Sequence, residues 1–137
     1  LKASVSASTT FKKFLISGEY EVIDYSTTEY FTSGFEDENL TITNIYQKAN
    51  NMKVGAEMNI KPFVIRGGYS KYGSAVAEKD FSRENFSYGI GINRGGYFID
   101  ITYVLSKEKN EHLLYSENPI KLQNTNHNVI FTLGFRY

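Results

Sequence analysis

The chain of 137 residues has the length of one domain, and its 15 basic and 15 acidic side chains give a formal net charge of zero. This balance argues against a nucleic-acid surface and against a polybasic membrane anchor, because both need an excess of Lys and Arg. The absence of Cys excludes a disulfide framework and thiolate chemistry.

Seven segments alternate apolar and polar residues, which is the pattern of β-strands with one apolar face. In chain order they are residues 1–9, 14–25, 52–60, 63–69, 86–93, 97–106 and 128–137. Short connections follow the first, third and fifth segments, whereas residues 27–50, 71–85 and 107–127 are predicted to be long loops. Tight turns at one end and long loops at the other are typical of an up-and-down antiparallel barrel.

The first long loop is predicted to contain a short helix. Asp37 would cap this helix, which carries Leu40, Ile45 and Ala49 and has Lys48 near its C-terminal end. Three successive β-branched residues at positions 41–43 oppose helix formation at this place.

The two faces of the predicted strands differ sharply in composition. One face is rich in Tyr, Phe and Ile, and the other carries charged residues among Gly and Ser. A small soluble barrel would be crowded by the apolar set, whereas in a membrane barrel that set faces lipid and every backbone amide is paired around the ring. The sequence therefore predicts an all-β, antiparallel, up-and-down transmembrane β-barrel in the bacterial outer membrane, with outer-membrane lipids around it.

Seven strands are an odd number, whereas bacterial single-chain barrels have even numbers. If the long loops are extracellular, residue 1 lies outside the cell, although an intact barrel starts in the periplasm. We therefore expect residues 1–137 to be a single segment from the C-terminal portion of a larger barrel, with the N-terminal remainder of that barrel as a partner, or to lack at least one strand before residue 1.

Three stretches, NNMKVGAEMNIKPFVIRGGYSKYGS, FSYGIGINRGGYFIDITYVLSKEKNEHLLY and HNVIFTLGFRY, resemble the C-terminal half of outer-membrane long-chain fatty-acid transporters of the FadL/TodX type, particularly the Bacteroidetes versions. GEYEVIDYS, at residues 18–26, fits the same pattern. The resemblance implies a 14-stranded barrel with an N-terminal plug that passes hydrophobic molecules such as fatty acids. The half of the family's chain that carries the plug has no counterpart in this sequence.

Candidate site residues are of two kinds. Lumen-lining charges are predicted at Glu19, Glu57, Arg66, Asp100 and Arg136, mainly as residues that keep the interior wet. The apolar and aromatic side chains that alternate to the end of the chain resemble the C-terminal signal recognised by the barrel-insertion machinery; they are Phe131, Leu133, Phe135 and Tyr137.

No enzyme, cofactor or metal site is predicted. His112 and His127 lack the spacing of a zinc motif, and we expect both to be solvated loop residues. The acidic run at residues 36–38 is interpreted as a helix start rather than a calcium site. No Ser-His-Asp arrangement can be argued from the sequence.

The function expected from the sequence is passage of hydrophobic small molecules, such as long-chain fatty acids, across the outer membrane. Two alternatives stay open. One is a small structural or surface-interaction barrel of the OmpA/OmpX kind, and the other is a soluble lipid-binding β-barrel whose apolar face points inward.

Overall fold

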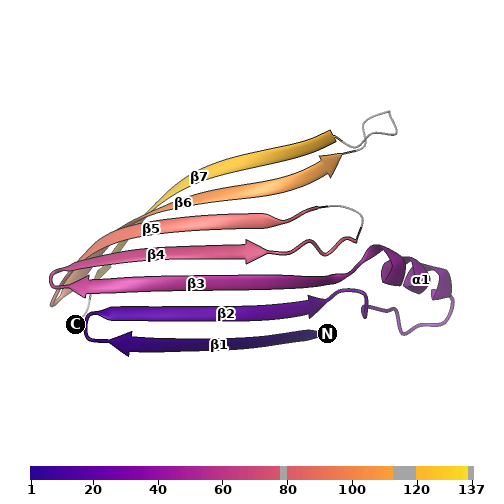
Figure 1. Cartoon of the computed structure of the whole chain (residues 1–137), viewed down its shortest axis with the longest axis horizontal. Helices are drawn as coiled ribbons and strands as arrows, with labels where there is room; N and C mark the ends of the chain where they lie inside the picture. Colours follow the sequence, from indigo (N-terminus) through magenta and orange to yellow (C-terminus); the bar gives the residue numbers. More distant parts are fainter. Residues whose placement is uncertain (78–79, 113–119, 136–137) are drawn as a thin grey trace.

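The computed structural model describes residues 1–77, 80–112 and 120–135, which form one antiparallel β-sheet with a short helix at one end (Figure 1). The strands lie across the sheet in chain order, so each pairs with its sequence neighbours. They are β1 (Lys2–Phe11), β2 (Phe14–Asp24), β3 (Lys48–Ile60), β4 (Phe63–Tyr72), β5 (Arg83–Arg94), β6 (Tyr97–His112) and β7 (Ile120–Phe135). The seven predicted strands and their up-and-down order are confirmed.

Two-residue turns join β1 to β2, β3 to β4 and β5 to β6 at one end of the sheet, which we call the short-turn end (Figure 1). The first turn is Lys12-Lys13, in which Lys12 has a φ of 53°, and the third is Gly95-Gly96, in which Gly95 has a φ of 46°. A positive φ at the first turn residue matches the twist of the flanking strands. The other connections lie at the opposite end, which we call the long-loop end.

The third predicted long loop, at residues 107–127, is wrong in extent. β6 continues to His112 and β7 begins at Ile120, and the two strands stay in register as far as that pair. β3 and β5 also begin three or four residues before the predicted strands. Alternation reveals a strand only where one face is apolar, whereas backbone N–H and C=O groups continue to pair where both faces are polar.

The predicted helix is present as α1 (Glu36–Ile45), but its predicted ends are wrong. Phe35 occupies the N-cap position without a side-chain hydrogen bond, so Asp37 lies inside the first turn instead of capping it. The chain becomes extended at Tyr46, and Lys48 and Ala49 belong to β3. The pairing of β3 with β2 therefore replaces the last predicted turn of the helix.

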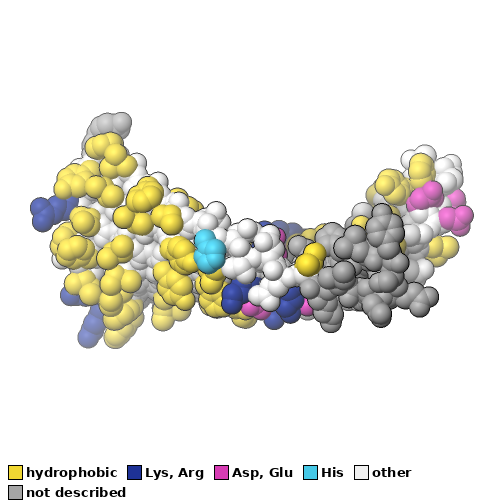
Figure 2. All heavy atoms as spheres, turned by 90° about the horizontal axis from the view of Figure 1, so that it is seen from above, with side chains coloured by type: hydrophobic (Ala, Val, Ile, Leu, Met, Phe, Trp, Pro, Cys, Tyr) yellow, Lys and Arg dark blue, Asp and Glu magenta, His cyan; other side chains and the backbone are white. Residues whose placement is uncertain are grey.

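The register places the alternating side chains on two faces, which we call the apolar face and the polar face. Every strand contributes large exposed side chains to the apolar face, among them Val5, Ile16, Tyr20, Met52, Val54, Ile65, Tyr88, Ile90, Ile99, Ile101, Val129, Phe131 and Leu133. Figure 2 shows such hydrophobic side chains gathered over the short-turn half of the molecule. No other element of the described chain covers this face.

Burial occurs mainly on the polar face instead. Ala49 and Val64 are only 3% exposed, and Glu21 and Asn51 are each 7% exposed. By the strand register, all four lie on the polar face. Among the described residues no large side chain is fully buried, so the sheet does not enclose an apolar core.

Side chains also converge on the polar face. A Cβ added at Gly91 would collide with the carboxylate of Asp100, and one added at Gly134 would collide with the ring of Phe98. A Cβ at Gly67, on the apolar face, would meet no atom within 4 Å. This asymmetry indicates that the sheet curves toward its polar face, with the apolar side chains splayed outward.

β1 and β7 form the two edges of the sheet and are not paired with each other in the described residues. The sheet is therefore open rather than closed into a ring. Among the described residues, no helix is long and apolar enough to cross a membrane.

Candidate functional site

Four predicted lumen-lining residues lie together on the polar face. Glu19 comes from β2, Glu57 from β3, Arg66 from β4 and Asp100 from β6. Arg136 lies outside the described residues. The strand register therefore brings together four charges that are separated by up to 81 positions in the chain, counted from residue 19 to residue 100.

Arg66 is the centre of this charge cluster. Its Nε donates to Oε2 of Glu57 at 2.7 Å, and Glu57 is its register partner on β3. Its second contact, from the terminal guanidinium nitrogen to Oδ1 of Asp100, crosses β5 and reaches β6. This reach is possible because β5 presents Gly89 and Gly91 to the polar face, so no side chain separates Arg66 from Asp100.

A second group of charges lies nearer the long-loop end. Lys53 Nζ donates to Oε1 of Glu19 at 2.8 Å. Glu21 accepts a hydrogen bond from Asn51 Nδ2 at 2.8 Å and forms an ion pair with Lys2 Nζ at 2.6 Å. The two groups together form a band of paired charges across β1 to β6.

The sequence analysis missed the residues that complete this band. Lys2, Glu21, Asn51 and Lys53 were not named as site residues, although each lies on the polar face. Alternation could have identified Glu21, two residues from Glu19, because strand side chains repeat with a period of two. Lys53 lies opposite Glu19 and Asn51 opposite Glu21, and these positions follow only from the register of β2 with β3.

Two grooves open along this region. One of about 440 Å³ lies over β1, β2 and β3 beside the Glu19–Lys53 pair. The other, of about 540 Å³, lies at the short-turn end and is lined by Lys12, Lys13, Lys61 and Glu57 together with uncharged polar and apolar residues.

We expect Arg66→Gln to lower the free energy of unfolding by about 1 kcal/mol, because it removes two partly exposed ion pairs of a few tenths to 1 kcal/mol each. Urea unfolding in detergent micelles measures this effect. The matched control is Lys71→Gln, which removes one 3.6 Å pair with Glu84 and should change stability less. Equal effects of the two substitutions would contradict a central role for Arg66.

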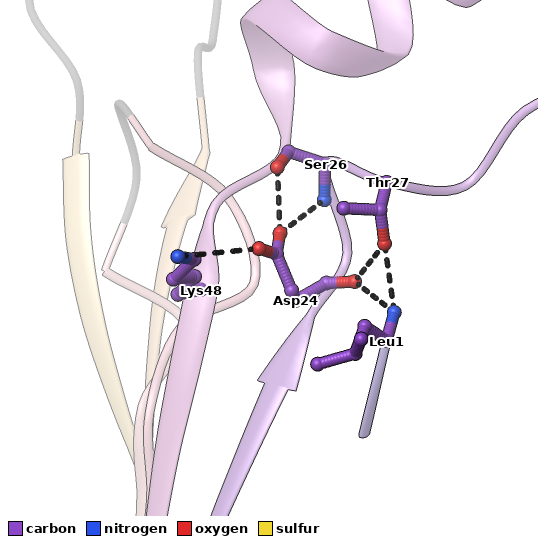
Figure 3. Close-up of polar contacts among 5 residues, drawn as sticks. All are labelled: Leu1, Asp24, Ser26, Thr27 and Lys48. Carbon is purple, nitrogen blue, oxygen red and sulfur yellow. Dashed lines mark hydrogen bonds and ion pairs between the residues drawn. The ribbon is translucent and has the colours of Figure 1, made fainter. Parts of the chain in front are cut away.

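At the long-loop end, Asp24 organises the exit from β2 (Figure 3). Its Oδ1 accepts hydrogen bonds from Ser26 N at 3.2 Å and Ser26 Oγ at 2.6 Å, and its Oδ2 lies 3.4 Å from Lys48 Nζ on β3. The backbone nitrogen of Leu1 lies 3.0 Å from the carbonyl oxygen of Asp24 and 2.7 Å from Thr27 Oγ1. These contacts fix where the loop leaves the sheet.

The first two long connections are joined to each other. Tyr46 and Val76 form an isolated antiparallel bridge. The amide of Gln47 donates to the carbonyl of Ala75 at 2.8 Å, and the amide of Ala77 donates to the carbonyl of Ile45 at 2.9 Å. The segment that follows α1 is therefore held against the connection between β4 and β5.

The remaining sequence candidates are dispersed. The acidic run at residues 36–38 occupies the first turn of α1, and among the described residues no group of three or more His, Asp or Glu side chains is placed so that it could hold a metal ion. His112 is the last residue of β6, and His127 lies within β7 rather than in a loop, with Nδ1 at 2.6 Å from Tyr103 Oη. Both placements correct the prediction of loop histidines.

The C-terminal candidates lie on the edge strand of the sheet. Phe131, Leu133 and Phe135 project from the apolar face of β7 and are exposed, with Phe131 at 74%. Tyr137 lies outside the described residues.

The fold and the charge band define a class of structure: an open, seven-stranded antiparallel sheet with one exposed apolar face and one polar face of paired charges. Comparison of the chain with protein-family models, curated proteins and solved structures finds no match. What this chain does must therefore be argued from its two faces.

Proposed function

We propose that this chain forms part of the wall of an outer-membrane β-barrel that passes hydrophobic small molecules such as long-chain fatty acids. In this proposal the apolar face contacts the lipid chains and the polar face lines the interior. The barrel is completed by further strands that pair with the free edges of β1 and β7, and 14 strands is the total that the resemblance to fatty-acid transporters implies.

One observation carries the membrane part of the proposal. The apolar face stays exposed over seven strands, whereas contiguous apolar patches on water-soluble monomers rarely exceed a few hundred Å². In lipid this surface needs no cover, and the paired strands leave few backbone groups unsatisfied within the sheet. The side chains that a soluble lipid-binding barrel would turn inward, Ile65, Ile101 and Phe131, are instead among the exposed ones.

Strand length supports the same proposal. β1, β2 and β4 have 10, 11 and 10 residues, and about 9 to 11 tilted residues span the hydrocarbon core. β6 and β7 are longer, at 16 residues each, and the last six residues of β6, at positions 107–112, are all polar. Because β6 and β7 are longer than the bilayer requires, we expect their ends to project from the membrane at the long-loop end.

The interior would be wetted by the band of paired charges. Arg66 and Lys53 are paired with carboxylates, so the charges of the band largely neutralise one another. The barrel wall would therefore offer a hydrated surface with a weak electrostatic field. The cargo is assigned from the resemblance to fatty-acid transporters. Because the alternating apolar residues at the end of the chain resemble the C-terminal signal of outer-membrane proteins, the insertion machinery would recognise Phe131, Leu133, Phe135 and Tyr137.

The test is reconstitution of the full-length protein into phospholipid vesicles that hold a fatty-acid-binding fluorescent reporter. We expect a fluorescent long-chain fatty acid presented outside to reach the reporter several-fold faster than in protein-free vesicles. Insertion without faster transfer would favour a structural barrel of the OmpA/OmpX kind. A full-length protein that stays dispersed in water without detergent would contradict every membrane proposal.

A further inference from the structure

The short-turn end of the sheet concentrates basic side chains. Each of the three two-residue turns carries or adjoins at least one of them, and we call Lys12, Lys13, Lys61 and Arg94 the basic rim. All four are exposed, and none forms an ion pair with another described residue. The nearest acidic residues on the polar face, Glu57 and Asp100, are both bound by Arg66.

The long-loop end has the opposite character. Acidic residues lie in the first turn of α1, and most of the described basic residues at this end are paired with carboxylates, among them in the contacts Lys48–Asp24, Lys71–Glu84, Arg83–Glu108 and Lys109–Asp80. Figure 2 shows dark blue side chains at the short-turn end and magenta side chains at the tip of the long-loop end. The net charge of zero therefore hides a segregation of charge along the strands.

Aromatic side chains lie beside the basic rim. On the apolar face of the strand ends they are Phe11, Phe14, Phe63, Tyr97 and Phe135, and all are exposed. Aromatic residues at this depth are typical of the border between hydrocarbon and headgroups, and the long stems of Lys and Arg reach from that border toward the phosphates.

We propose that the basic rim binds the headgroups of anionic phospholipids in the membrane leaflet at the short-turn end. This inference rests on the proposed function, because it requires the apolar face to lie in lipid. The partner is chosen by charge complementarity: an anionic surface raises binding about fivefold for each nearby Lys or Arg, and the attraction falls with salt. The net charge of the whole chain, which argued against a polybasic anchor, is a sum over two ends of opposite charge.

The experiment compares two variants of the full-length protein in vesicles of phosphatidylcholine mixed with an equal amount of phosphatidylglycerol. The rim variant carries Lys12→Gln, Lys13→Gln, Lys61→Gln and Arg94→Gln. The matched control removes the same number of charges at the other end, through Lys48→Gln, Lys71→Gln, Lys107→Gln and Lys109→Gln. Spin-labelled phosphatidylglycerol and phosphatidylcholine report the ratio of their affinities for the protein surface.

We expect the native protein to prefer phosphatidylglycerol, and we expect the rim variant to lose at least fivefold of that preference. The control should keep it, and high salt should remove it from the native protein. An unchanged ratio in the rim variant would overturn the inference alone and would leave an acidic protein as the partner of these charges. A native protein that enters neither lipid mixture would contradict the proposed function and this inference together.

Discussion

Arginine in place of Ile101 is expected to destabilise the bilayer-inserted protein by about 2–4 kcal/mol, the cost of a cationic side chain on the lipid face at the bilayer midplane. Ile101 lies on the apolar face, near the middle of the alternating part of β6, and is 42% exposed. Because so much of this side chain is free of protein contacts, Ile101→Arg tests what surrounds the apolar face rather than how it is packed.

Reversible urea unfolding in phospholipid vesicles measures the change in the free energy of unfolding. The control is Leu40→Arg on α1, where the side chain is 63% exposed and lies outside the sheet. It should change stability by no more than about 0.5 kcal/mol, as ordinary surface substitutions do. If Ile101→Arg is as mild as this control, the apolar face does not lie in hydrocarbon.

Valine in place of Gly91 is expected to destabilise the protein by roughly 1–3 kcal/mol, the usual cost of inserting atoms into a filled space. The new side chain would occupy the position of the Asp100 carboxylate. Asp100 would have to turn away from Arg66, and the contact that crosses β5 would be lost.

Gly67→Val is the matched control, because Gly67 lies on the apolar face of the neighbouring strand with no atom within 4 Å of an added Cβ. We expect it to be neutral within about 0.5 kcal/mol. A double-mutant cycle with Asp100→Ala assigns the cause, since removal of the carboxylate should make Gly91→Val less costly. Additive effects of Gly91→Val and Asp100→Ala would show that the collision is not with Asp100.

The number, order and faces of the strands could be predicted because the signal is local. Each strand can be recognised from the alternation within its own residues, and the length of each connection indicates how neighbouring strands pair. The same rule explains where prediction failed: β6 beyond residue 106 and β3 before residue 52 are polar on both faces, so pattern alone could not distinguish paired strand from loop.

The site was predictable as a face but not as a set of contacts. Glu57, Arg66 and Asp100 each alternate with apolar residues in their own strand, and their assignment to the polar face was correct. The contact between Arg66 and Asp100 depends on the register of three strands and on the bare backbone of Gly91 between them. No single stretch of sequence contains that information, and the burial of Glu21 between Lys2 and Asn51 is hidden for the same reason.

The agreement between strand order and chain order has a consequence for assembly. Since each strand pairs only with its sequence neighbours, a newly added strand needs no crossover past strands already in place, and the longest connection to be closed is the one between β2 and β3. The three hairpins with two-residue turns are the most local units of the sheet, and we expect them to add side by side. β7 is the one described strand outside these three hairpins, so we expect it to add to β6 after the hairpin of β5 and β6 has formed.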